Sequence, residues 1–309
     1  MFNDSMARDC KSPEVVTIVE SRRDMKKLVC IIVWLLIAGT SGRAQDVQPP
    51  TALDRAFNRI YNFDFTGAYA LLDVEQRAHP DNPLIYSVRS AAYLFSEYDR
   101  MKILEMDFFA DDNKITDKKR VKPDPAARVE LFKMTDEARK RAQARLATNP
   151  QDREAMFALL MAIGVENNYA GIVEKKYFRS YSLTKEAQQY ARKLLAMNPP
   201  FCDAYMTLGS VEYVVSNLNF FFRLFVHFDQ IEGSKQKAIQ DMGKVIDCGR
   251  FYPPFAKILL SVIYLRENQQ QQALKLLQEM ERDYPENPLF KNEVNRILAK
   301  IAATPRKKH

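Results

Sequence analysis

Glycine and histidine are both scarce in this chain. Only 9 glycines and 3 histidines occur among its 309 residues. Phosphate-binding loops and the tightest β-turns depend on glycine, because glycine adopts positive φ at no steric cost. The low glycine content therefore argues against phosphate-binding loops and tight β-turns.

Catalytic motifs are also missing. The three histidines, His79, His227 and His309, form no H-E-x-x-H pair, and no G-x-S-x-G, G-x-G-x-x-G or Walker sequence occurs. Glu166 and Glu174 could face one another across a turn, but acidic pairs are common on helical surfaces and no burial is implied. The sequence predicts a non-catalytic protein, with no catalytic residues, cofactor or metal ligands.

The excess of positive charge is mild. Lys and Arg number 46 against 39 Asp and Glu, a formal net charge of +7. The visible basic clusters are Lys118-Lys119-Arg120, in a polar segment, and a tail at 304–309, and such charge runs are usually solvated. No basic stripe with interleaved aromatic residues accompanies them, so the sequence does not favour nucleic-acid binding.

A secretory signal occupies residues 25–44. Met25-Lys26-Lys27 precede eleven residues without a charge, Leu28 to Ala38, and Gly42 and Ala44 are small residues at the −3 and −1 positions of a cleavage site. The apolar run is shorter than the ~20 residues that a membrane-spanning helix needs. We expect cleavage between Ala44 and Gln45, and export of a soluble protein to the periplasm or the medium. Residues 1–24 are interpreted as an upstream extension or a mis-assigned start.

Two cysteines remain after the predicted cleavage. Cys202 lies at the start of one expected helix and Cys248 at the end of its antiparallel partner, so both lie at the same end of a hairpin. An oxidising compartment permits a disulfide between them. Two buried, unreactive thiols are the alternative, since sequence spacing does not determine the Cα separation.

The C-terminal region carries a helix-pair pattern. Two apolar-periodic segments, Phe255–Leu265 and Gln271–Met280, are separated by a polar stretch and followed by a proline. Their large and small residues resemble the 34-residue tetratricopeptide repeat (TPR), in which small residues let the two helices approach closely. The matching residues are Leu260, Ser261, Tyr264, Ala273, Leu277, Met280 and Pro285.

Weaker matches to this pattern lie further upstream, and Asn-Pro steps that begin at residues 82, 149, 198 and 287 separate the units irregularly. The additional matches are Ala56, Phe65, Ala68, Leu72, Pro80, Ala187, Ala191, Leu194, Pro199, Tyr205, Leu208 and Gly209. The resemblance predicts an all-α fold over residues 45–303, an irregular TPR-like α-solenoid of antiparallel helix pairs.

A polar segment at 110–125 departs from the repeat pattern. It is charged, is bracketed by prolines, and is interpreted as a loop. Asp111, Asn113 and Asp117 suggest a calcium loop, but Thr116 stands where the sharp turn needs glycine and Lys122 where glutamate is needed. We therefore expect no calcium site here.

A phenylalanine-rich insertion at 217–233 is the second departure. Five of the chain's 19 phenylalanines fall between Leu218 and Phe228, and on a helix near 218–229 Asn219, Arg223 and His227 would form one narrow polar stripe. A buried helix that plugs the superhelix is one interpretation. The others are a partner, ligand or membrane-interface surface, or His227 as a catalytic base. The candidate partner-binding residues of this insertion are Phe221, Arg223, Phe225 and His227.

The TPR resemblance implies a function. Members of the family bind peptides or protein surfaces in a groove lined by their A helices, and Tyr205, Glu212, Lys257 and Tyr264 are the candidate groove positions here. The leading expectation is an exported protein-binding scaffold. The alternative is a structural or assembly component of the cell envelope that docks on a membrane or an oligomeric partner through the Phe-rich helix, and an enzyme comes last.

Overall fold

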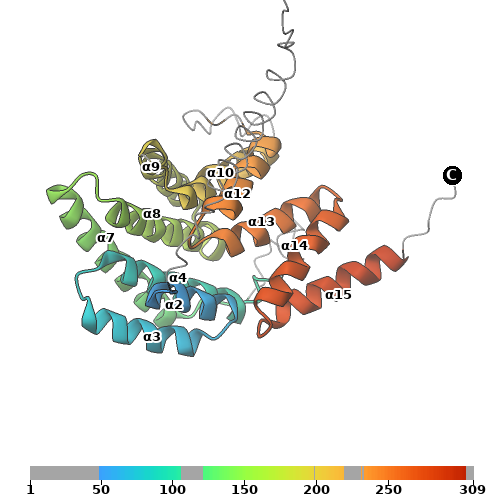
Figure 1. The fold of residues 1–309 in the computed structure, drawn as a ribbon, viewed down its shortest axis with the longest axis horizontal. Helices are drawn as coiled ribbons and strands as arrows, with labels where there is room; N and C mark the ends of the chain where they lie inside the picture. Colours follow the sequence, from blue (N-terminus) through green and yellow to red (C-terminus); the bar gives the residue numbers. More distant parts are fainter. Residues whose placement is uncertain (1–48, 106–120, 198, 219–230, 232, 304–309) are drawn as a thin grey trace, which may run out of the picture. The chain divides into compact units, whose positions relative to one another are not determined.

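The structure is a computed structural model that describes residues 49–105, 121–197, 199–218, 231 and 233–303. From Pro50 onward these residues belong to one compact unit, Pro50–His309. All regular structure within the described residues is helical, without a strand (Figure 1). The predicted all-α class is therefore confirmed.

Eleven α-helices, one π-helix and one 3₁₀ helix make up the described part. In chain order they are α2 (Ala52–Tyr61), α3 (Phe65–Ala78), α4 (Pro83–Arg100), α7 (Pro125–Thr148), α8 (Arg153–Asn168), η1 (Tyr169–Val173), α9 (Tyr177–Ala196), η2 (Cys202–Ala204), α10 (Tyr205–Asn217), α12 (Lys235–Cys248), α13 (Pro253–Arg266), α14 (Gln270–Asp283) and α15 (Pro288–Ala303).

Several helices begin with a short polar residue followed by proline. The Oδ1 atoms of Asn82 and Asp124 accept hydrogen bonds from Leu84 N and Ala126 N, both at 2.9 Å, and each residue precedes a proline at the first helical position. Asn287 accepts from Leu289 N at 3.0 Å in the same arrangement. The polar side chain accepts from the N–H of the second helical residue, which would otherwise be unpaired, and proline at the first position has no N–H that needs a partner. The Asn-Pro steps at 82 and 287 thus start helices.

Helices that follow one another along the chain pack together. α2 contacts α3, α4 contacts α7, α8 contacts α9, α10 contacts α12, and α13 contacts α14, and α15 packs on α14 (Figure 1). Further contacts join these pairs, among them α4 with α8 and α12 with α13. The core is therefore assembled mainly from consecutive helices.

Small residues permit close approach within two of these pairs. A Cβ atom on Gly209 of α10 would lie 3.2 Å from the carbonyl oxygen of Ala238 and 3.3 Å from Cβ of Asp241, both on α12. In the pair of α13 and α14, Ser261 and Ala273 are fully buried. Larger side chains at these positions would push the paired backbones apart.

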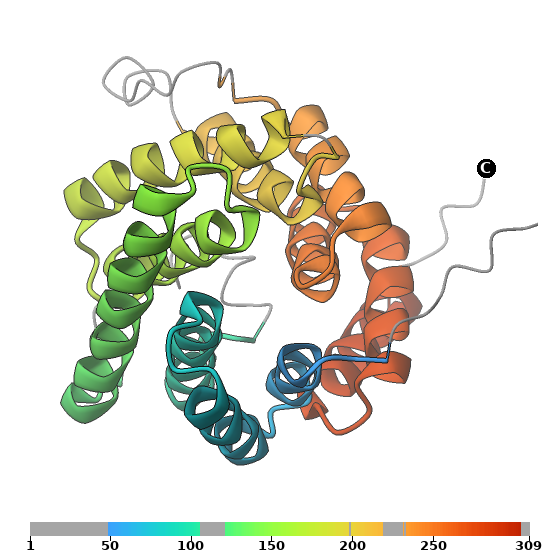
Figure 2. The same ribbon diagram turned by 60° about the vertical axis from the view of Figure 1, so that its left-hand side comes forward.

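The first described helix contacts segments far along the sequence. The Tyr61 hydroxyl at the end of α2 donates to the carbonyl oxygen of Phe251 at 3.3 Å, and Asn287 Nδ2 donates to the carbonyl oxygen of Tyr61 at 2.8 Å. In Figure 2, α2 (blue) lies beside the red C-terminal helices. In an open repeat array each unit contacts only its neighbours. The contacts of α2 depart from that rule.

Two central helices are buried almost all round. Nearly every residue of α4 and α8 is buried or half-buried, and α8 with η1 forms Arg153–Val173, the one described stretch long and apolar enough to cross a membrane. However, 72% of its most apolar window is buried inside the fold. Such burial is typical of a core helix packed on all sides.

Candidate functional site

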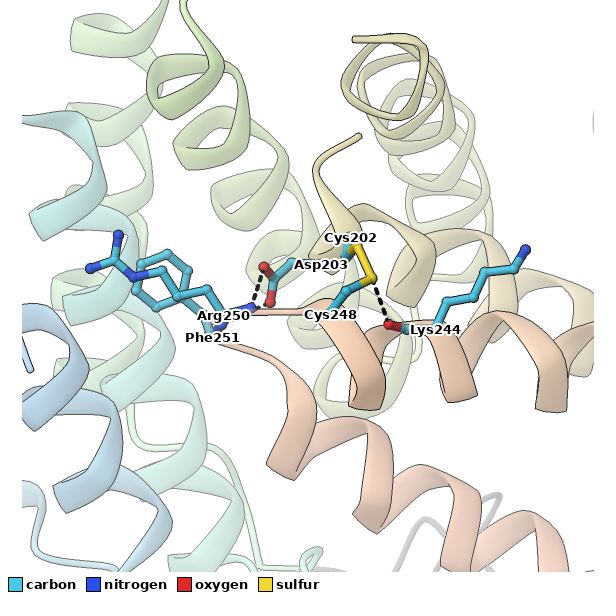
Figure 3. The surroundings of a disulfide bond; sticks show 6 residues. All are labelled: Cys202, Asp203, Lys244, Cys248, Arg250 and Phe251. Atoms are coloured by element: carbon cyan, nitrogen blue, oxygen red, sulfur yellow. Dashed lines mark hydrogen bonds between the residues drawn. A yellow bond between two sulfur atoms is a disulfide. The ribbon is translucent and has the colours of Figure 1, made fainter. Parts of the chain in front are cut away.

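A disulfide and a buried carboxylate organise the turn between α12 and α13 (Figure 3). Cys202 and Cys248 are bonded, with their Cα atoms 5.7 Å apart, which is the first of the two alternatives left open by the sequence. Cys248 Sγ also lies 3.1 Å from the carbonyl oxygen of Lys244, a contact without a hydrogen because a disulfide sulfur carries none. The bond ties η2 to the C-terminal end of α12.

The neighbouring Asp203 accepts three backbone hydrogen bonds. Its carboxylate binds the N–H groups of Arg250 at 2.9 Å, Phe251 at 2.8 Å and Tyr252 at 2.7 Å. The carboxylate is buried, and this burial raises the pKa of Asp203, although the three N–H groups lower it. Three successive donors on one carboxylate hold the turn in a single conformation.

Arg250 and Phe251 of this turn also contact α2. Arg250 donates to the carboxylate of Asp54 through Nε at 3.1 Å and through a terminal nitrogen at 3.0 Å. The ring of Phe251 packs between Phe57 of α2 and Phe157 of α8, with centroid distances of 5.2 and 5.6 Å. The disulfide, Asp203 and the turn therefore connect α2 to the C-terminal pairs.

The expected groove residues make contacts within their own helix pairs. Tyr205 lies beneath the ammonium group of Lys244 at 4.2 Å, and Lys257 pairs with Glu279 at 2.9 Å. Tyr264 is half-buried and packs against two apolar clusters, which include residues of its own pair, α13 and α14, and of neighbouring helices. Tyr205, Lys257 and Tyr264 each keep a partly exposed surface.

Glu212 differs from the other three candidates because it is buried. Its carboxylate accepts hydrogen bonds from Gly233 N and Ser234 N, both at 3.0 Å, and Lys237 Nζ lies 3.9 Å away. These donors directly precede α12, and Gly233 is the last residue of the phenylalanine-rich insertion. Glu212 thus stabilises a turn of its own chain and does not face a groove.

A charged cluster that the sequence did not reveal lies where α7, α8 and α9 pack together. Arg139 of α7 bridges Glu166 of α8, at 2.6 Å, and Glu186 of α9, at 2.9 Å. Arg128 at the start of α7 pairs with Glu174 at 2.8 Å. Glu166 and Glu174 therefore bind different arginines and do not form a carboxylate pair.

The π-helix η1 lies within this cluster. Tyr169 is fully buried beside Phe132, and its burial, with the nearby carboxylates of Glu97 and Glu174, raises the pKa of Tyr169 to about 12. Partial burial raises the pKa of Glu174, but hydrogen bonds from Arg128 and Lys176 hold it below its usual value. Glu174 is therefore an ionised, paired residue at neutral pH.

Next to η1, the start of α9 exposes large apolar side chains. Tyr177 is 59% exposed and Phe178 is 94% exposed, the highest exposure among the large hydrophobic residues described. Lys176 and Arg179, which flank them, are also exposed. An exposed aromatic pair is unusual, because phenylalanine is among the residues most often buried.

Two shallow depressions lie over the turns that precede α4 and α8. Their volumes are about 390 and 460 Å³, and they share Asp81 and Arg145. Arg145 pairs there with Asp152 at 2.8 Å, so its charge is already matched. These depressions follow from the meeting of two turns and carry no arrangement of catalytic groups.

Several predicted features lie outside the described residues. They are the signal peptide with its cleavage site at Ala44 and Gln45, most of the polar loop, the basic tail, and the candidate binding residues Phe221, Arg223, Phe225 and His227.

No protein-family model matches the chain, and a search of curated proteins finds no significant match. Within the part of the chain that the structure describes, no group of three or more His, Cys, Asp or Glu side chains is placed to hold a metal ion. The geometry of the chain itself therefore supplies the basis for a functional proposal.

Proposed function

We propose that this chain is an exported, non-catalytic scaffold of TPR-like antiparallel helix pairs. The consecutive packing of α2 on α3, α4 on α7, α8 on α9, α10 on α12 and α13 on α14 supports this interpretation. The burial of Ser261 and Ala273 and the close approach at Gly209 support it further, because the TPR pattern requires small residues there.

The scaffold binds a peptide or a protein surface along the A helices of its C-terminal pairs, α10 and α13. One observation carries this location: most side chains of α4 and α8 are buried, whereas most side chains of α13 and about half of those of α10 are partly or fully exposed. Val214 of α10 is 60% exposed, and Tyr205, Lys257 and Tyr264 keep part of their surface. A partner needs such accessible apolar and polar surface.

The disulfide supports export. Bonds such as Cys202–Cys248 persist in oxidising compartments and are rare in the cytosol. We expect the protein recovered from the cell envelope or the medium to begin at Gln45. Mass spectrometry of its N-terminal peptide tests the site, and recovery of the protein with an intact leader from the cytosol would remove this part of the proposal.

Site-specific photocrosslinking tests the binding surface. A photoreactive amino acid replaces Val214 of α10 in one variant and Val74 of α3 in the other, positions that are 60% and 58% exposed. Irradiation of the native envelope should give a discrete protein adduct from position 214 and none from position 74. Because the two positions are similarly exposed, position 74 is a control for crosslinks that arise from random collisions with other proteins.

Mass spectrometry identifies the crosslinked partner. An excess of a fragment of that partner should then lower the yield of the adduct that the purified protein forms from position 214 with the intact partner. The same adducts from both positions, or none from position 214, would show that α10 is not a binding surface.

A further inference from the structure

We propose a second interaction surface at the start of α9: a docking tip that binds the surface of an anionic lipid bilayer. Tyr177 and Phe178 enter the headgroup region, and the neighbouring cations bind lipid phosphates. This proposal does not rest on the peptide-binding surface of α10 and α13, because it involves other residues on another helix.

The first observation is the exposure of the tip. Residues 176–179 are four consecutive exposed residues, and Phe178 is 94% exposed. Leu183, further along α9, is buried and provides the helix with its core contact. The two aromatic rings are therefore not needed for packing of the described fold, and they are available to a second surface.

The second observation is the rigid base beneath the tip. Glu174 N donates to the carbonyl oxygen of Tyr169 at 2.9 Å, and Lys176 N donates to that of Ala170 at 2.7 Å. Lys175, between them, has a φ of 57°, which reverses the chain so that α9 begins at Tyr177. Ser180 Oγ donates to Asn167 Oδ1 at 2.6 Å and fixes the first turn of α9 to α8. The aromatic pair projects from a supported turn.

The third observation is the charge around the rings. Between Glu174 and Lys185 the chain carries four basic residues against one acidic residue, a net charge of +3. Lys176 pairs with Glu174 at 3.0 Å, and Arg179 lies 3.8 Å from Glu166, so these carboxylates offset part of the positive charge while they hold both basic side chains near the tip. Cations beside exposed aromatic rings are typical of protein segments that bind anionic membrane surfaces.

The size of the exposed patch favours a bilayer over a protein. A stable protein interface buries about 800 Å² on each partner. Two aromatic side chains at one helix start do not supply an apolar area of that size. They do suit the bilayer interface, where tyrosine and other aromatic rings lie at the level of the headgroups between water and hydrocarbon.

Vesicle flotation tests the proposal. The chain Gln45–His309 contains the whole compact unit and lacks the apolar leader, which could itself bind lipid. It is mixed with vesicles of phosphatidylcholine, either alone or with phosphatidylglycerol. We expect it to float with the anionic vesicles only, and Phe178→Ser to weaken that binding about tenfold, because the apolar ring no longer leaves water. Added salt should weaken binding by the wild type.

Val74→Ser is the matched control, because it removes an exposed apolar side chain from α3. It should bind vesicles as the wild type does, and both variants should keep the wild-type melting temperature. Wild-type protein that stays with the soluble fraction, or equal flotation with neutral vesicles, would overturn the proposal. Unchanged flotation of Phe178→Ser would overturn it too. If Phe178→Ser still floats with anionic vesicles but no longer binds a protein partner that the wild type binds, the tip docks a protein and not a bilayer.

Discussion

Single charged residues join parts of this protein that are distant in sequence. Asp54 of α2 forms a capping box with Thr51, and its carboxylate also accepts from Arg250, which lies 196 positions further along the chain. Asp203 performs a similar task for three consecutive backbone N–H groups. A buried or half-buried carboxylate with several donors stabilises the folded state, whereas removal leaves those donors without an acceptor.

The pair of Asp54 and Arg250 predicts a pH-dependent stability. Partial burial raises the pKa of Asp54, but the hydrogen bonds from Arg250 and Thr51 bring it below the ordinary 3.8. A lowered folded-state pKa stabilises the protein above that ordinary value, and the stabilisation is lost as pH falls through the folded pKa. Asp54→Asn should cost about 1 kcal/mol at pH 7.

Thermal melting at several pH values measures this effect. The difference in melting temperature between the wild type and Asp54→Asn should shrink once the pH falls below 3.8, the ordinary pKa of an aspartate. Asp247→Asn, which changes an exposed aspartate of α12, serves as the control and should melt like the wild type at every pH. A difference that stays constant from neutral to acid pH would contradict the assignment.

Arg139 links α7 to α8 and α9 through two ion pairs. It pairs with Glu166 and Glu186, and Glu166 is buried. Arg139→Met keeps an unbranched apolar stem but removes the guanidinium, which leaves Glu166 with the longer contact to Arg179. We expect a loss of about 3 kcal/mol in the free energy of unfolding by urea, because a buried charge loses its closest partner. Arg282→Met, at an exposed position, should change it by less than about 0.5 kcal/mol.

At the scale of the helices, the disulfide bonds η2 to the last residue of α12. It closes a loop with a sequence separation of 46 residues. A crosslink of that span restricts the unfolded chain and stabilises the folded state by about 2–4 kcal/mol. Cys248→Ser should therefore lower the melting temperature to that of the reduced wild type. A reductant should have no effect on the variant, and a wild type that melts equally with and without reductant would contradict this expectation.

Local sequence signals predicted the elements well. The segments Phe255–Leu265 and Gln271–Met280 lie within α13 and α14, because apolar periodicity and a following proline are properties of neighbouring residues. Such signals contain no information about Glu212, which would appear the same on an exposed helix face. Its burial depends on Gly233 and Ser234, which reach it only in the folded chain.

The charged cluster and the docking tip were missed for related reasons. Arg139, Glu166 and Glu186 come from three helices, and no spacing along one helix brings them together. Phe178 is one of many aromatic residues in the sequence, and its exposure depends on the chain reversal at Lys175. Paired cysteines were foreseen only as one of two alternatives, because their Cα separation is also a tertiary property.

At the scale of the whole described fold, the long-range contacts of α2 determine which helices respond when a single side chain is removed. In an open array of repeats, a local defect affects the neighbouring repeats most. Here Phe251 contacts Phe57 of α2 and Phe157 of α8, so one side chain lies against helices that are far apart in sequence. Loss of its ring should therefore loosen α2 as well as the turn to which Phe251 belongs.

Hydrogen exchange can detect this coupling. Phe251→Ala should speed amide exchange in α2 by about tenfold or more, because removal of a buried aromatic ring costs about 3–5 kcal/mol and part of that cost falls on its contact with Phe57. Leu131→Ala is the matched control: Leu131 is also buried, but it belongs to a cluster of residues from α4, α7, α8 and η1 that contains no residue of α2. Its exchange effects should be strongest in α4, α7 and η1. If both variants speed exchange in α2 equally, α2 is coupled to the whole described fold and not specifically to the turn at Phe251.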